Sequence, residues 1–189
     1  MLPPLLTPEA AAITIQAGGI VAYPTEAVWG LGCDPFNADA VQRLLEIKQR
    51  PASKGMIVIA ATPEQALPYL FWDELPAARR RQILASWPGP NTWLVPCRPE
   101  VPTWLRGEHD TLAVRVTGHA VAAALCRAVG GLVVSTSANR AGETPARRFE
   151  QLNATLRARL DGWIAGDTDG LCAPSTIRDA RSGVVLRGG

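Results

Sequence analysis

Hydrophobic residues along the chain form short continuous runs that alternate with segments of helical spacing, a pattern typical of a sheet covered by helices. The apolar and β-branched runs predict strands at 20–23, 56–60, 93–95, 111–116 and 132–134, and short final strands at 163–165, 175–177 and 184–186. Helical spacing and capping residues predict helices at 7–17, 37–48, 62–70, 76–86, 119–129 and 149–160, with residues 25–34 as a loop. No repeat, low-complexity segment or linker interrupts this order, so we expect a single α/β domain over residues 1–189.

The apolar run at 132–134 ends abruptly in small hydroxyl and amide side chains. Ser135, Ser137 and Asn139 alternate, so an extended backbone would point all three side chains to the same side. Because α/β sheets present ligands at the carboxyl ends of their strands, this stretch is a candidate binding site. Taken alone, it is equally compatible with a solvated loop of turn-forming residues.

The composition limits the class of protein. Hydrophobic residues make up 47% and charged residues 19% of the 189 positions, as in ordinary globular proteins. The net charge of +2 is too small to require a nucleic-acid partner. Lys48 and Lys54 are the only lysines among the 19 basic residues. A predominance of arginine suits anionic ligands, because guanidinium forks pair with phosphate and carboxylate, but a GC-rich genome would produce the same bias.

Cysteine and histidine spacing argues against a metal site or a disulfide framework. The four cysteines lie far apart without a Cys-x-x-Cys pair, which predicts reduced, mostly buried thiols. The two histidines have no ligand-like spacing, so no protein metal site is expected. The amino terminus does not resemble a signal peptide, and no apolar run approaches the length of a membrane span. The sequence therefore predicts a soluble cytoplasmic protein without membrane contact.

Several loops that follow predicted elements carry cations or small hydroxyl groups, whereas Walker-A, Gly-x-Gly-x-x-Gly and triad patterns are absent. These loops contain Thr25-Glu26, Lys48-Gln49-Arg50-Pro51 with Lys54, Arg115 with Thr117, Ser135 with Ser137 and Asn139, Pro174-Ser175-Thr176, and Arg187. Together they describe a groove with cations and hydroxyl donors but no candidate nucleophile. Such a groove suits a polyanion, such as a nucleoside triphosphate, that is held by charge and hydrogen bonds.

Longer motifs around these residues occur in an order that matches a known family. They are Tyr23-Pro24-Thr25-Glu26 with Trp29-Gly30-Leu31-Gly32, Lys48-Gln49-Arg50-Pro51 with Lys54-Gly55, Trp87-Pro88-Gly89-Pro90 with Thr92, Ala113-Val114-Arg115-Val116, Ser135-Thr136-Ser137-Ala138-Asn139 with Gly142, Pro174-Ser175-Thr176-Ile177-Arg178-Asp179, and Arg187-Gly188. The chain thereby resembles the threonylcarbamoyl-AMP synthase family, in its short single-domain form (TsaC or YrdC) rather than the longer Sua5 form. The resemblance implies an open, twisted α/β sheet of mixed strand direction, flanked by helices, with a large concave basic groove.

The resemblance also implies a reaction and its residues. L-threonine, bicarbonate and ATP, with Mg2+, would give L-threonylcarbamoyl-adenylate and pyrophosphate, making the protein a nucleotidyltransferase. The product would pass to the tRNA threonylcarbamoyl-transferase complex (TsaD/TsaB/TsaE) for modification of adenosine 37 of tRNA. By similarity, the ATP-binding residues are Arg50, Lys54, Thr117, Ser137, Asn139 and Arg187, and the threonine-binding residues are Thr25, Arg115, Ser135 and Ser175. Lys48 and Arg50 are the predicted catalytic residues, because they would neutralise phosphate charge.

Two departures from the family pattern occur, and the first begins with Gly55-Met56, where many relatives have Pro-Leu after the lysine. Ile59 occupies the place of a histidine found in many relatives, so the contribution of that histidine is missing or comes from elsewhere, and the methyl side of the threonine pocket is expected to be more apolar. Val116-Thr117 stands where many relatives have a proline after the arginine, which leaves the assignment of Thr117 open. The role of Glu26 is also open between orienting the amine or a metal-bound water and a structural contact near Gly30.

Two other functions remain compatible with the residues. One is an RNA-binding or ribosome-maturation factor that uses the same basic face for weak contact with tRNA or double-stranded RNA. The small net charge and the lack of an RNA-binding motif argue against this as the main role. The other is a sugar-phosphate enzyme, which rests on fold analogy alone.

Overall fold

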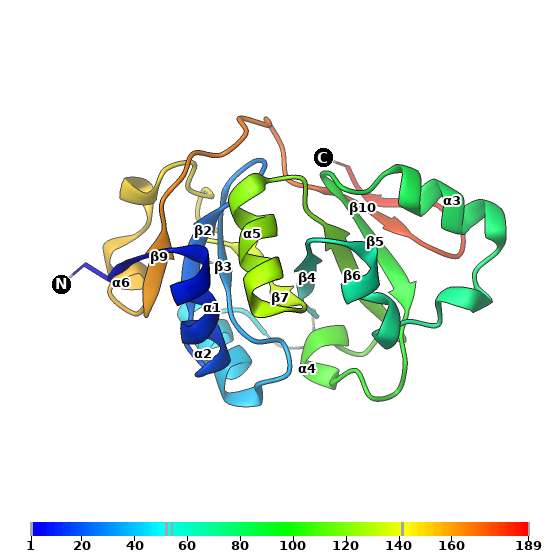
Figure 1. Ribbon diagram of the computed structural model, residues 1–189, viewed down its shortest axis with the longest axis horizontal. Helices are drawn as coiled ribbons and strands as arrows, with labels where there is room; N and C mark the ends of the chain where they lie inside the picture. Colours follow the sequence, from blue (N-terminus) through cyan, green and yellow to red (C-terminus); the bar gives the residue numbers. More distant parts are fainter. Residues whose placement is uncertain (1, 52, 54, 141, 189) are drawn as a thin grey trace.

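The computed structural model describes residues 2–51, 53, 55–140 and 142–188, and this part of the chain forms two sheets of mixed strand direction flanked by helices (Figure 1). The first sheet has the strand order β1 (Leu5–Leu6), β9 (Gly162–Ile164), β2 (Val21–Pro24), β3 (Trp29–Gly32) and β8 (Thr136–Ser137). The second has the order β11 (Val185–Arg187), β10 (Thr176–Asp179), β5 (Asn91–Pro96), β6 (Thr111–Val116), β4 (Ile57–Ala60) and β7 (Val133–Val134). The predicted α/β class and mixed strand direction are confirmed.

The helices begin largely where the capping residues predicted. They are α1 (Pro8–Gln16), α2 (Ala38–Lys48), α3 (Ala77–Ala85), α4 (Thr103–Arg106), α5 (Ala120–Val129) and α6 (Ala154–Arg157). The Thr7 hydroxyl accepts a hydrogen bond from the Ala10 amide (3.3 Å), and the Asn37 side chain accepts one from the Ala40 amide (3.0 Å). These bonds satisfy amides that have no partner within the first helical turn.

Two predicted helices are wrong, because side chains in them bind the backbone in other ways. Residues 62–70 form two separate 3-10 turns, Pro63–Gln65 and Leu67–Tyr69, and the Thr62 side chain makes no capping bond. The region 149–160 contains a 3-10 turn, Phe149–Gln151, followed by α6. The Asn153 side chain starts α6 by accepting from the amides of Thr155 (2.9 Å) and Leu156 (3.4 Å), so no continuous helix forms.

The expected loop at 25–34 contains strand β3, which pairs antiparallel with β2. Its glycines permit a close approach of neighbouring chain: a Cβ atom at Gly32 would lie 2.7 Å from the carbonyl oxygen of Val134. A glycine-rich strand carries little hydrophobic signal, so only the neighbouring strands reveal it.

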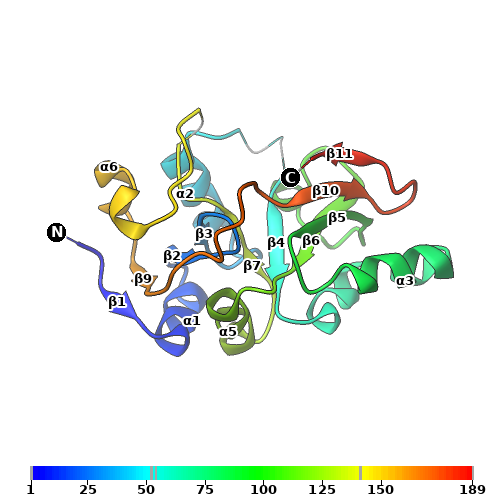
Figure 2. The ribbon, with the colours of Figure 1, turned by 90° about the horizontal axis from the view of Figure 1, so that it is seen from above.

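Besides the connection from β3 through α2 to β4, two segments pass from one sheet to the other. Around Ser135 the chain leaves β7, which pairs with β4 in the second sheet, and enters β8, which pairs with β3 in the first. Residues 165–175 pass in the opposite direction, from β9 to β10, as the orange segment in Figure 2 shows. The predicted strand at 132–134 therefore continues into a crossing between two sheets.

One face of the second sheet is only partly covered. The register pairs Ile57 with Ala113 and Ile59 with Arg115, so these residues share that face. Ile59 is fully buried in a hydrophobic cluster with Leu125 of α5, which covers this end of the sheet. Beyond α5 the same face is open, and the site described below lies there.

Two further features concern the cysteines and the hydrophobicity of the helices. The four cysteines are free thiols, of which Cys33, Cys97 and Cys126 are buried and Cys172 is exposed, as the spacing predicted. Within the described residues, no helix combines the length and the hydrophobicity that a membrane crossing requires.

Candidate functional site

A cavity of about 400 Å3 lies where residues of the two sheets meet. Its floor is the open face of the second sheet, with the apolar side chains Ile57, Leu94, Ala113 and Ile177. Polar residues from the surrounding loops line its walls. The volume and the apolar floor with few polar groups are typical of a small-molecule site.

Seven of the predicted site residues line this cavity, although they come from separate strands and loops. They are Thr25, Arg50, Arg115, Ser135, Ser137, Ser175 and Arg187. Lys48, Thr117 and Asn139 are not among the residues that line it. Lys54 lies outside the described residues.

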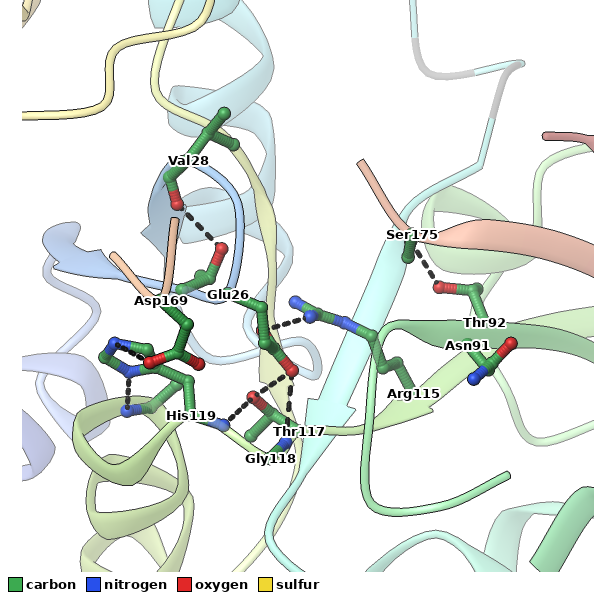
Figure 3. A network of polar contacts seen from close by, with 12 residues as sticks. Glu26, Val28, Asn91, Thr92, Arg115, Thr117, Gly118, His119, Asp169 and Ser175 are labelled. Atoms are coloured by element: carbon green, nitrogen blue, oxygen red, sulfur yellow. Dashed lines mark hydrogen bonds and ion pairs between the residues drawn. The ribbon is translucent and has the colours of Figure 1, made fainter. Parts of the chain in front are cut away.

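Arg115 and Glu26 form a buried ion pair at one end of the cavity (Figure 3). The exposed fractions are 7% for Arg115 and 4% for Glu26. Burial alone would raise the pKa of the Glu26 carboxyl, but the Arg115 guanidinium and backbone N–H donors, including that of Gly118, outweigh burial and lower it. Glu26 is therefore ionised at neutral pH, and its charge balances that of Arg115.

Thr117 belongs to the same network and does not face the cavity. Its hydroxyl donates to Glu26 Oε1 (3.0 Å) and accepts a hydrogen bond from the His119 amide (3.2 Å). The exposed fraction of Thr117 is 2%. The role of Thr117 in ATP binding stays a prediction, and in this structure its hydroxyl is engaged with Glu26 and His119.

Arg50 and Arg187 line another wall and lie close enough to influence each other. Burial, followed by the charge of Arg187, lowers the pKa of Arg50, and burial lowers the pKa of Arg187. Arg50 donates to the carbonyl of Gly55 (3.0 Å), and Arg187 donates to the carbonyl of Ser175 (3.0 Å). Two neighbouring guanidinium groups favour an anion between them.

The described lining carries more positive than negative charge. Its arginines are Arg50, Arg106, Arg115 and Arg187, and its carboxylate is Glu26. Because the charge of Glu26 offsets that of a single arginine, the lining keeps a net positive charge for a ligand. The arrangement can hold a molecule with several anionic groups.

Lys48 lies behind the cavity wall. Its ammonium donates to the carbonyl oxygens of Ser137 and Asn139, the latter at 2.7 Å, and 4% of the residue is exposed. Burial, and then the charge of Arg50, lower the pKa of Lys48 to about 8, while Glu143 acts in the opposite direction. Lys48 therefore supports the backbone of the serine-bearing wall, and the predicted direct action on phosphates is not what its contacts indicate.

The prediction that Ser135, Ser137 and Asn139 point to the same side is wrong for Asn139. Ser137 lines the cavity from β8 of the first sheet, and Ser135 lines it from the position between β7 and β8. The Asn139 amide instead donates to the carbonyl oxygens of Arg140 (2.8 Å) and Glu143 (2.7 Å) and closes a local turn. The extended backbone ends before Asn139, so the alternation of side chains ends there too.

The expectation that Ile59 forms the methyl side of the pocket is also wrong. Ile59 has no exposed surface and packs in the core beneath α5, and it is not one of the lining residues. Ile57, two residues earlier on the same strand face, lines the cavity instead.

Sequence reasoning missed several residues of the site. Thr111 lies on the cavity floor, and the period of two from Arg115 along the strand could have indicated it. Arg106, at the end of α4, and His109, shortly after it, line the cavity. The end of α4 lies next to the start of β4, where the Met56 amide donates to the Leu105 carbonyl (2.7 Å). No local signal in the sequence indicates that contact.

Sequence comparison identifies relatives along nearly the whole chain. The family model described as "Telomere recombination", for the Sua5, YciO and YrdC proteins, matches residues 14–189. The chain is 54% identical over 182 residues to the threonylcarbamoyl-AMP synthase of Stenotrophomonas maltophilia (strain K279a). This alignment covers 96% of the present chain and 98% of the relative. The chain is 54% identical over 179 residues to the protein of the same name from Xanthomonas euvesicatoria pv. vesicatoria (strain 85-10), with 95% and 96% covered.

Solved structures agree with this relationship. P. abyssi Sua5 complexed with L-threonine superposes with a TM-score of 0.84 at 31% identity over 91% of this chain, which spans 50% of the Sua5 chain. E. coli YciO superposes with a TM-score of 0.83 at 25% identity, over 98% of this chain and 91% of that one. The family predicted from the ordered motifs is confirmed. The chain belongs to the Sua5, YciO and YrdC family and, within it, to the threonylcarbamoyl-AMP synthases.

Proposed function

We propose that this protein is an L-threonylcarbamoyl-adenylate synthase, which forms threonylcarbamoyl-AMP and pyrophosphate from L-threonine, bicarbonate and ATP for modification of tRNA. The observation that carries this proposal is the joining of two anion-binding features in one cavity. Arg115 lies at one end, suited to the carboxylate of an amino acid, and Arg50 with Arg187 lines another wall, suited to phosphates. The names of relatives that are 54% identical support the same activity.

The proposed reaction has two steps. The amine of threonine adds to bicarbonate, or to the CO2 derived from it, to give a carbamate with loss of water. A carbamate oxygen then attacks the α-phosphorus of ATP, and the bond to pyrophosphate breaks. Neither step needs a covalent bond to the enzyme, so the protein acts by holding the reactants and by stabilising negative charge with its arginines.

We assign Thr25, Arg115, Ser135 and Ser175 to threonine and Arg50, Ser137 and Arg187 to ATP, which leaves Lys48 and Asn139 in supporting roles. The Ser175 hydroxyl is held by that of Thr92 at 2.8 Å, which fixes its direction (Figure 3). Lys54 stays a predicted phosphate contact from the sequence.

Mg2+ is proposed to arrive with the nucleotide. Within the described ranges, no three His, Cys, Asp or Glu side chains gather as metal ligands. Because Mg2+ is commonly held by substrate phosphates and few protein groups, this donor set fits a metal carried on ATP. When bound, the ion would neutralise phosphate charge beside Arg50 and Arg187.

Carbamate derivatives decompose in water, so we propose that the product passes to a tRNA-modifying enzyme of the TsaD/TsaB/TsaE type in the cytoplasm.

The test of the whole proposal is incubation of purified protein with threonine, bicarbonate and labelled ATP. Release of pyrophosphate that requires both threonine and bicarbonate is the expected result. Tight binding of double-stranded RNA without any turnover would favour the RNA-binding role instead.

Selectivity among amino acids provides a further prediction. The site offers hydroxyl groups from Thr25, Ser135 and Ser175 to the substrate hydroxyl. Serine keeps that hydroxyl and loses a methyl group worth about 1 kcal/mol, whereas valine leaves a buried group unpaired at a cost of about 2–3 kcal/mol. We therefore expect specificity constants in the order threonine, serine, valine, measured by pyrophosphate release. If valine matched serine, the pocket would read shape rather than the hydroxyl.

The charge of Lys48 leads to a pH-dependent prediction. The protonated ammonium attracts the Ser137 and Asn139 carbonyls most strongly, and this form is lost as the pH rises through about 8. We expect wild type to exceed Lys48→Met in kcat/KM for ATP by about three- to tenfold below that pH, and the ratio to shrink above it. Taking the ratio at each pH cancels the ionisation of the substrates. A ratio that stays constant across this range would show that the charge is unimportant.

A further inference from the structure

The Glu26 carboxylate accepts hydrogen bonds from one short segment, residues 115–118, although nothing in the proposed reaction uses it directly. It accepts hydrogen bonds from Arg115 Nη1, from the Thr117 hydroxyl (3.0 Å) and from the Gly118 amide (3.0 Å). Its own carbonyl accepts from the amide of Leu171 (3.2 Å), in the segment that crosses between the sheets. Figure 3 shows the carboxylate between Arg115 on one side and Thr117 with Gly118 on the other.

Thr117 connects this carboxylate to the start of α5. Its hydroxyl accepts from the His119 amide (3.2 Å), which leaves the hydroxyl proton for Glu26 and sets the direction of that bond. His119 is itself held, because its Nδ1 accepts from the Ala122 amide (3.4 Å) and its Nε2 contacts the Asp167 carbonyl (2.8 Å). The position of Glu26 is thus tied to a helix end rather than to a free loop.

The consequence appears at the Arg115 guanidinium, which Glu26 engages through Nη1. Nε of Arg115 is buried and has no acceptor in the part of the chain that the structure describes. The nitrogens of a planar guanidinium donate in fixed directions, so holding one of them sets the direction of the others. With Nη1 occupied by Glu26 and Nε buried, Nη2 is the nitrogen of Arg115 left for a ligand in the cavity.

We propose that Glu26 and Thr117 are positioning residues that set the direction of the Arg115 guanidinium and thereby the affinity of the enzyme for the carboxylate of threonine. This inference rests on the proposed function. A buried ion pair often stabilises a protein no better than apolar residues of the same size. The pair at this cavity wall is therefore better explained by its effect on the orientation of the Arg115 guanidinium than by a gain in stability. Loss of the Thr117 hydroxyl removes one donor to Glu26 without changing any charge. It therefore tests the orientation of the Arg115 guanidinium separately from its charge.

The test compares Thr117→Val, which keeps the shape and loses the hydroxyl, with Thr117→Ser, which keeps the hydroxyl. Steady-state pyrophosphate release gives kcat and both KM values, and thermal unfolding checks the fold. We expect Thr117→Val to raise KM for threonine about three- to tenfold, with kcat and KM for ATP nearly unchanged. Thr117→Ser should restore the wild-type KM. The control, Thr155→Val, alters an exposed threonine on α6 and should change none of these values.

Calorimetric titration of threonine into the same variants separates this inference from the proposed function. An unchanged KM for threonine in Thr117→Val, equal rises in both KM values, or no recovery in Thr117→Ser would overturn the inference while leaving the synthase activity intact. Threonine binding that weakens in Thr117→Val and recovers in Thr117→Ser, in a protein without turnover, would support the inference and overturn the proposed reaction. If wild type neither bound threonine nor released pyrophosphate, both would be overturned.

Discussion

Replacement of Arg50 by alanine is expected to lower kcat/KM for ATP by about 10- to 100-fold while the fold stays intact. Arg50 follows the end of α2, lines the cavity and lies close enough to Arg187 to feel its charge. A hydrogen bond to a charged group contributes about 1.5–3 kcal/mol, and a buried phosphate without its partner loses that contribution. Because its neighbour is also a cation, removal of Arg50 leaves no unpaired buried carboxylate, so stability should change little.

Two further variants sharpen the Arg50 result. Arg50→Lys should recover only part of the loss, because an ammonium is a point charge and cannot reproduce the planar fork. Arg81→Ala removes an exposed arginine on α3 with the same change of net charge, and it should leave kcat/KM unchanged. Near-normal kinetics in Arg50→Ala would contradict the assignment of Arg50 to phosphate binding.

Replacement of Arg115 by methionine is expected to lower the free energy of unfolding by about 3–5 kcal/mol at neutral pH, besides abolishing threonine binding. The cause is Glu26, which is 4% exposed and would remain as a buried carboxylate without its cation. Unfolding in urea, followed by circular dichroism, measures the loss. The double variant Glu26→Gln/Arg115→Met should recover part of it, because the uncompensated charge is then gone.

The difference in free energy of unfolding between wild type and Arg115→Met should depend on pH with a definite sign. In wild type the pKa of Glu26 is lowered, so the stabilisation by the ion pair is present above the unfolded carboxyl pKa of about 4.3 and is lost as the pH falls through the lower folded pKa. Without Arg115, burial dominates and raises the pKa of Glu26. On acidification the variant therefore protonates Glu26 at a higher pH than wild type does, and it then no longer carries a buried charge. The stability gap between the two proteins should therefore narrow on acidification. A gap that is independent of pH would show that Glu26 is not its source.

Local signals along the chain were sufficient to predict secondary structure where a side chain bonds to the backbone of its near neighbours. Thr7 and Asn37 cap the helices they were expected to cap, because the bonds involve amides three residues away. Local signals failed where a side chain reached further. Gln65 donates to the carbonyl of Cys126 (3.0 Å) and accepts from the Ala61 amide (2.7 Å), and the predicted helix at 62–70 does not form.

The candidate site divides in the same way. The ordered motifs identified the loops that contain Arg50, Arg115, Ser135, Ser175 and Arg187, and all of these residues line one cavity. The motifs could not distinguish residues that face the cavity from residues that support it, because both kinds have the same chemistry and the same place in the chain. Lys48 and Thr117 belong to the supporting kind, through bonds to groups far away in the sequence.

By itself, the amino-acid sequence determined the α/β class, the caps of the first two helices, the family and the set of loops that carry anion-binding groups. Those properties depend on residue types at fixed spacing, which a single chain records directly. Only the tertiary structure decided that β7 and β8 belong to different sheets, and that Glu26 holds Nη1 of the Arg115 guanidinium. Both depend on backbone groups and charges that folding brings together from distant positions in the chain. Burial strengthens the hydrogen bonds and ion pairs between them, because the interior has a lower dielectric constant than water.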